Sequence, residues 1–111
     1  MAKVKKLILV TATHHPLHKL FSRLLDEMAE KLGAEKEVKY EDYMFLIKYG
    51  ETDEFGMAGT PQLLVELDDG TIKPVLTQKT MPLTASLQPD VEKAREIILS
   101  KVKELTGEEV G

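Results

Sequence analysis

The feature that most constrains the fold is a pair of neighbouring segments near the start of the chain. Residues 6–12 (KLILVTA) form an apolar run of strand length, which is typical of a strand buried on both faces. Pro16 suits a first helical turn and Gly33 suits a C-terminal cap, so a helix is expected over residues 16–32. The apolar residues of that helix share one stripe, formed by Leu17, Leu20, Phe21, Leu24, Leu25, Met28 and Leu32. A strand followed closely by a helix predicts the start of a βαβ unit.

The middle of the chain predicts a second strand, a short helix and a hairpin. Residues 38–43 (VKYEDY) alternate in the manner of a strand, and residues 44–56 contain one or two helical turns. Residues 62–67 and 71–77 are expected to be the two strands of a hairpin. Asp69-Gly70 lies between them and favours the positive φ angles of a tight primed turn.

The last part of the chain predicts an edge strand and a closing helix. Pro74 has no amide hydrogen to donate to a neighbouring strand, so its strand is expected at the edge of the sheet. Pro89 begins a final helix with an apolar stripe of Val91, Ala94, Ile98, Val102 and Leu105. The expected order is β-α-β-α-β-β-α, which defines an α/β fold with a four-stranded mixed sheet.

Length and composition indicate one globular domain. The 111 residues suit a single domain spanning residues 1–111, and an apolar fraction of 42% is enough for a packed core. Residues 106–111 are expected to form a frayed tail. Charged residues make up 31% of the chain and are mostly Lys and Glu, a composition compatible with a heat-adapted source.

Charge and hydropathy argue against two classes of partner. The net charge is −4, and no basic block follows the opening KVKK, so a nucleic-acid partner is not expected. No signal peptide is recognisable, and no segment approaches the roughly 20 apolar residues of a membrane span. We therefore expect no membrane partner and a cytoplasmic location.

The chain contains no cysteine. Disulfides, thiolate metal sites, iron–sulfur clusters and cysteine nucleophiles are therefore all excluded. No Ser-His-Asp spacing, P-loop or Gly-rich dinucleotide fingerprint is present either, so an enzyme is not expected.

Two stretches resemble the thioredoxin family, over about residues 6–105. The segment FGMAGTPQLLVELDDG is similar to the family's proline loop and following strand, which implies a cis bond between Thr60 and Pro61. The segment ATHHPLHKLFSRLLDEMAEKL is similar, without a gap, to the family's active-site helix A-x-W-C-G-P-C-K. The resemblance implies a thioredoxin-like fold without the additional N-terminal strand and helix of the larger members.

The departures from the family pattern bear on function. His15 and His18 stand at the positions of the two cysteines, His14 stands at that of the tryptophan, and Leu9 at that of a buried acidic residue. Disulfide exchange needs a thiolate that attacks sulfur and a second thiol that resolves the mixed disulfide, and imidazole can do neither. A dithiol-disulfide oxidoreductase is therefore excluded, and a glutathione-related or peroxidase-like enzyme with other chemistry is the least favoured alternative.

Three interpretations of the histidines remain open. They are ordinary surface residues near a helix start, or they bind a metal, or they bind an anion at the helix N-terminus. As metal ligands, His14, His15 and His18 would offer three nitrogens suited to zinc, nickel or copper, so a divalent metal is an alternative to having no cofactor.

The favoured hypothesis is a redox-inactive binding or adaptor module. Its groove would hold a protein or peptide partner, with a homodimer as an alternative. The expected groove residues are His14, His15, His18, Ala58, Gly59, Thr60, Pro61, Met81 and Leu83. Met81 and Leu83 are expected to be exposed, since they lie in a connection of few charges that is longer than usual.

Overall fold

The computed structural model describes residues 3–107. The order of elements in this range is the predicted β-α-β-α-β-β-α. The elements are β1 (Val4–Thr11), α1 (His18–Leu32), β2 (Glu35–Tyr40), α2 (Tyr43–Tyr49), β3 (Gln62–Leu67), β4 (Ile72–Thr77) and α3 (Val91–Thr106). The strands form a mixed sheet in the order β2-β1-β3-β4, in which β1 and β2 are parallel and the other neighbours are antiparallel. The predicted α/β class with a four-stranded mixed sheet is confirmed.

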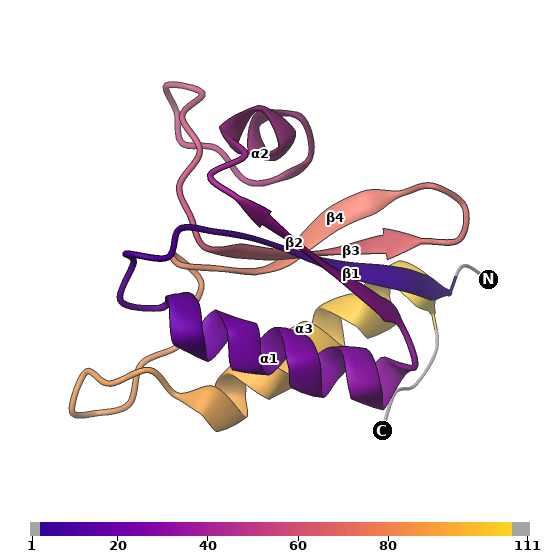
Figure 1. Cartoon of the computed structure of the whole chain (residues 1–111). Coiled ribbons are helices and arrows are strands. Elements are labelled where there is room, and N and C mark those ends of the chain that lie inside the picture. The colour runs from indigo at the N-terminus through magenta and orange to yellow at the C-terminus, as the bar shows by residue number, and fades with distance from the viewer. Residues whose placement is uncertain (1–2, 108–111) are drawn as a thin grey trace.

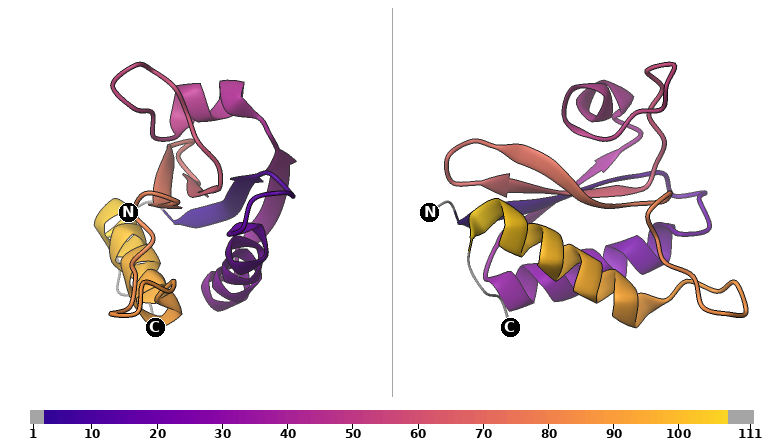
Figure 2. Two further views of the ribbon diagram at one scale, coloured as in Figure 1. Left: turned by 90° about the vertical axis from the view of Figure 1, so that its left-hand side faces the viewer. Right: turned by 180° about the vertical axis from the view of Figure 1, so that it is seen from behind.

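The sheet separates two cores of unequal size. Helices α1 and α3 cover one face, and the short helix α2 lies over the other (Figure 1; Figure 2). Side chains alternate along a strand, so Leu7 and Leu9 of β1 point to the larger core while Ile8 and Val10 point to the smaller one. The buried residues on the α2 side are Ile8, Val10, Leu46 and Leu64. The α1 stripe supplies the larger core with Phe21, Leu24, Leu25 and Met28.

Several predicted boundaries are wrong by a few residues. Helix α1 begins at His18, and Pro16 lies in the turn that precedes it. Strand β2 begins at Glu35 and ends before Asp42, whose side chain accepts the Phe45 N–H and caps α2. Thr106 belongs to α3, so the predicted tail does not begin there, and residues 108–111 lie outside the described range.

The β3–β4 connection differs from the predicted primed turn. Gly70 has a φ of 91°, but Asp69 does not share the positive φ that a type I′ turn requires. The Gly70 N–H donates to the Leu67 carbonyl at 3.0 Å, and the Leu67 N–H donates to the Thr71 carbonyl at 2.8 Å. The connection is therefore a three-residue loop that ends in a left-handed glycine. The edge position predicted for Pro74 is confirmed, because β4 is an outer strand.

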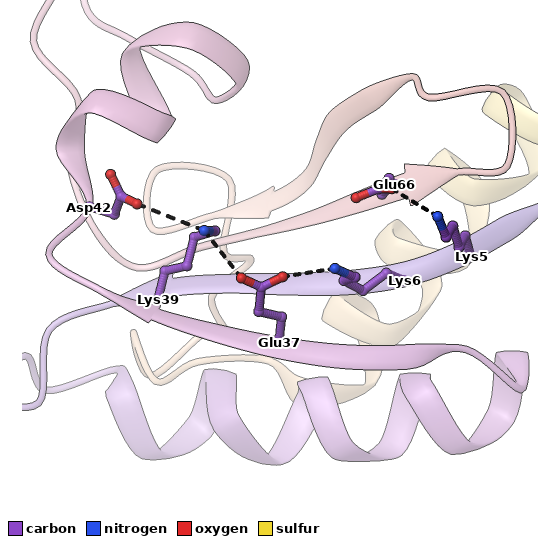
Figure 3. Close-up of polar contacts among 6 residues, drawn as sticks. All are labelled: Lys5, Lys6, Glu37, Lys39, Asp42 and Glu66. Atoms are coloured by element: carbon purple, nitrogen blue, oxygen red, sulfur yellow. Dashed lines mark hydrogen bonds and ion pairs between the residues drawn. The ribbon is translucent and has the colours of Figure 1, made fainter.

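Charged side chains occupy the strands beyond the apolar cover of α2 (Figure 3). The Glu37 carboxylate lies 2.9 Å from the Lys6 ammonium and 3.1 Å from that of Lys39. Hydrogen bonds from Lys6 and Lys39 hold the pKa of Glu37 below its ordinary value, and the bond from Lys6 has the larger effect. This part of the sheet therefore meets solvent with paired charges. In residues 3–107, no helix has both the length and the apolar character needed to cross a membrane.

Candidate functional site

Three connections meet at one end of the sheet. The register pairs Val10 with Gln62, and Gln62 with Thr77, so the end of β1, the start of β3 and the end of β4 lie at the same edge. The segments beyond these strand ends are residues 12–17, 58–61 and 78–90, and they gather beside the start of α1 (Figure 1; Figure 2). The topology thus places the histidine segment near the proline loop, as the groove hypothesis requires.

His15 is held by hydrogen bonds on both ring nitrogens. The Leu17 N–H donates to His15 Nδ1 at 3.0 Å, so this nitrogen carries no hydrogen and Nε2 carries it instead. His15 Nε2 then donates to the Gln78 side-chain oxygen at 3.3 Å. The imidazole, which is partly exposed, therefore caps the amide of the residue that precedes α1.

Gln78 connects the histidine segment to the proline loop. Its backbone N–H donates to the Pro61 carbonyl at 3.1 Å while its side chain accepts from His15. The Thr60–Pro61 bond is cis, as the resemblance implied. A β-carbon on Gly59 would lie only 2.7 Å from Gln78 Nε2, so any other residue there would force the Gln78 amide to shift. Sequence reasoning missed Gln78, because a lone glutamine after a strand carries no recognisable signal.

The three histidines have different surroundings. His18 Nδ1 lies 2.9 Å from the Thr11 hydroxyl, and its ring lies 6.4 Å from the Tyr40 ring between centroids. His14 is exposed, whereas His15 bonds to Gln78. Among residues 3–107, no three His, Cys, Asp or Glu side chains are grouped so that they could hold a metal ion. The structure therefore does not assemble the predicted ligand set of His14, His15 and His18.

Two backbone amides that an anion would need at the start of α1 are already hydrogen-bonded within the protein. The Leu17 N–H points to the His15 ring, and the His18 N–H donates to the His15 carbonyl at 3.1 Å. These two amides at the start of α1 are therefore already used within the protein. An anion would have to displace the His15 ring to reach the Leu17 amide.

The expectation that Met81 is exposed is wrong. Thr77 and Thr80 form a tight turn, in which the Thr77 N–H donates to Thr80 Oγ1 at 2.8 Å and the Thr80 N–H donates to the Thr77 carbonyl at 3.1 Å. This turn folds the chain back, and Met81 enters the larger core with 7% of its surface exposed. Thr60 and Pro61 are also largely buried, and Ala58 and Gly59 are half-buried. Leu83 is exposed, as expected.

The connection beyond Met81 forms a small projecting hairpin. Leu83 and Pro89 face each other in an isolated antiparallel bridge, and the Thr84 N–H donates to the Gln88 carbonyl at 2.7 Å. Leu87 lies near the tip, 75% exposed and with a φ of 64°, a conformation that bulky side chains rarely adopt. The exposed apolar residues of this connection are therefore Leu83 and Leu87, not Met81. The sequence offered no sign that Leu87 would be left-handed.

A small polar cavity lies behind the proline loop. It encloses about 30 Å³ and is lined by Glu51, Thr52, Met57, Gly59, Gln62, Thr77, Gln78 and Lys79. The buried Gln62 amide fixes one wall, because Nε2 donates to the carbonyls of Glu51 and Gly59 while Oε1 accepts the Glu51 N–H. The volume suits one or two water molecules.

The segments around the start of α1 present both polar contacts and exposed apolar side chains. Comparison of the chain with protein-family models, curated proteins and solved structures finds no match. What the site presents is an imidazole whose two nitrogens are both engaged, a proline loop with a cis bond, and two exposed leucines. With no cysteine in the chain, these groups cannot carry out thiol chemistry.

Proposed function

We propose that this protein is a redox-inactive, thioredoxin-like module that binds a protein or peptide partner. The binding surface is the rim, which we define as residues 13–18, 58–61 and 82–89. One observation carries the proposal: His15, which the resemblance aligns with the first cysteine of the family, is joined through Gln78 to the carbonyl of the cis proline Pro61. A rim with these contacts and no thiol can bind a partner but cannot exchange disulfides.

The composition of the rim supports protein contact. Leu83 and Leu87 are 53% and 75% exposed on the hairpin, in a chain whose residues are 31% charged. Exposed apolar groups framed by polar ones are typical of interaction sites. The left-handed backbone at Leu87 supports the same view, because strain at an exposed apolar residue is retained where the residue has a use.

The absence of redox activity is tested by insulin reduction in the presence of dithiothreitol. We expect no rate above the uncatalysed background, because the protein has no thiolate to offer. Turnover that copurifies with the protein through successive columns would contradict the proposal.

The binding role is tested by panning a random-peptide phage library against the purified protein. Synthetic copies of the enriched peptides should lose about tenfold or more in affinity when Leu83→Asp and Leu87→Asp are combined, because each places a charge in an apolar contact. The control is Val38→Asp, which places the same charge at an exposed apolar residue of the edge strand β2. If this variant weakens binding as much as the rim variant, or if no peptide is enriched, the rim is not a binding site.

The alternative of metal binding by the histidines is tested with the same purified protein. Zinc, nickel or copper that bound the histidines would raise the melting temperature, and His15→Ala with His18→Ala would remove the effect. We expect no such shift, since the rings of His15 and His18 already bond to Gln78 and Thr11. A tight metal complex lost in the double variant would replace the binding-module proposal.

A further inference from the structure

A second surface, formed by residues 41–57, concentrates the charge of the molecule. This segment contains α2 and the connection that follows it, with Lys48 as its single cation. Its carboxylates are Glu41, Asp42, Glu51, Asp53 and Glu54. Its net charge of −4 equals the net charge of the whole chain, so the remaining residues are neutral in sum.

The same segment exposes large apolar side chains. Phe55 and Met57 are 81% and 65% exposed, and Met44 and Ile47 on the outer side of α2 are 76% and 51% exposed. Only Leu46 of α2 is fully buried, against the smaller core. Exposed apolar groups framed by carboxylates indicate an interaction surface, because contact with water alone does not favour exposed apolar side chains.

The part of this surface that carries Phe55 and Met57 is held in one conformation. Thr52 and Ala58 pair in an antiparallel bridge, and the Asp53 N–H donates to the Met57 carbonyl at 2.8 Å. Asp53 Oδ1 accepts the N–H groups of both Phe55 and Met57 at 2.9 Å. These two backbone hydrogen bonds hold the pKa of Asp53 below its ordinary value of 3.8, and the one from the Met57 N–H contributes most. The hairpin is therefore preorganised, which lowers the entropy lost on binding.

We propose that the 41–57 surface docks a cationic, amphipathic segment of a partner protein, separately from the rim. The apolar side of the segment would cover Phe55, Met57 and Ile47. Its Lys or Arg residues would meet the exposed carboxylates of Glu41, Glu51 and Glu54, since Asp42 is paired with Lys39 and Asp53 holds the hairpin. The charge of −4 on residues 41–57 favours a cationic occupant over the alternatives. A second copy of the chain would bring an identical charge of −4 to the contact, and nucleic acid or an anionic lipid surface would be repelled in the same way.

The test uses two synthetic helical peptides of about 18 residues, one built of Leu and Lys and the other of Leu and Glu in the same pattern. We expect the Lys peptide to bind and the Glu peptide not to bind. Affinity for the Lys peptide should fall several-fold between about 50 mM and about 300 mM salt, because screening weakens charge pairing. Combined Phe55→Ser and Met57→Ser should reduce that affinity about tenfold or more.

Two matched comparisons separate docking from general charge attraction and from misfolding. Combined Leu83→Ser and Leu87→Ser alters the rim, carries the same kind of change and should leave the affinity unchanged. Asp53→Asn keeps an oxygen acceptor for the two amides and should bind within a few-fold of wild type, whereas Asp53→Ala frees the hairpin and should bind more weakly.

Three results would overturn the proposal. They are binding of the Glu peptide with similar affinity, retention of Lys-peptide affinity in the Phe55→Ser and Met57→Ser variant, and self-association in sedimentation that this variant abolishes. The last result would assign the surface to a second copy of the chain. None of these outcomes bears on peptide binding at the rim, which is measured with Leu83 and Leu87 variants.

Discussion

At the scale of single residues, His15 stabilises the fold through hydrogen bonds on both of its ring nitrogens. Its Nδ1 accepts the N–H of the residue two positions later, which is the geometry that Asn or Asp side chains provide in an Asx turn. Its Nε2 reaches Gln78, 63 positions away in sequence. One side chain therefore supports both the local turn and the contact with the proline loop.

These two roles can be separated by substitution. We expect His15→Ala to lower the free energy of unfolding by about 1 kcal/mol, because the Leu17 amide and Gln78 both lose a partner. His15→Asn should recover more than half of that loss by capping Leu17, while it is too short to reach Gln78. Urea denaturation of the two variants measures the difference. Equal losses would show that the cap of Leu17 contributes nothing.

Leu87 offers a second test at a single position. A left-handed conformation costs a branched residue roughly 1 kcal/mol, and Asn tolerates it better. We therefore expect Leu87→Asn to raise the free energy of unfolding by about 0.5 kcal/mol. Leu83→Asn is the matched control on the same hairpin, since Leu83 is also exposed and has no positive φ. Thermal or urea denaturation that gave the same change for both variants would argue against strain at Leu87.

At the scale of elements, an ion pair joins the two helices that cover the larger core. Arg95 of α3 donates from Nε to one Glu27 oxygen at 2.7 Å and from an Nη atom to the other at 3.2 Å. These hydrogen bonds hold the pKa of Glu27 below its ordinary value of 4.5. Both side chains are more than a third exposed, so solvent screening limits the benefit.

The pair predicts a pH-dependent contribution of Glu27. A lowered pKa means that its stabilisation is fully present above pH 4.5 and is lost as the pH falls through the lower value of the folded state. We expect Glu27→Gln to cost about 0.5 kcal/mol at neutral pH and nothing once Glu27 is protonated. Arg95→Lys keeps the charge and loses the two-pronged contact, so it should give an intermediate loss. A Glu27→Gln loss that is the same in acid and at neutral pH would contradict this account.

The elements also show what the sequence can and cannot predict. Periodicity and turn signals together predict the type and order of all seven elements, because buried apolar residues such as Phe21, Leu24 and Ile98 recur at helical spacing and Asp69-Gly70 marks the hairpin. Strand β2 was placed three residues late, since its EKE start is stabilised by ion pairs that an apolar pattern does not reveal. The burial of Met81 depends on the Thr77–Thr80 turn, and the Gln78 contacts join residues far apart in sequence. Such contacts exist only after folding.

At the scale of the whole molecule, the sheet has one heavily covered face and one lightly covered face. The core under α1 and α3 holds most of the buried apolar residues, whereas α2 is anchored by Leu46 on Ile8, Val10 and Leu64. Local stability follows the number of buried apolar contacts, so the two faces should open with different free energies. The binding surface that we propose at residues 41–57 thus lies on the less stable side, and the hairpin hydrogen bonds of Asp53 supply local order there.

Two large-to-small substitutions test this division. Phe21→Ala in the larger core should lower the free energy of global unfolding by about 3–5 kcal/mol, because it leaves a cavity in place of a fully buried side chain. Leu46→Ala should instead release α2 first, since Leu46 is the one fully buried residue of that helix and Phe45 and Tyr49 are only partly buried against the smaller core. Hydrogen exchange followed by mass spectrometry separates the two cases. In Leu46→Ala the amides of α2 should exchange much faster while those of β1 and β3 change little, whereas in Phe21→Ala all protected amides should accelerate together. Uniform acceleration in Leu46→Ala would mean that both faces unfold as one unit, and the surface at residues 41–57 would then be as stable as the core.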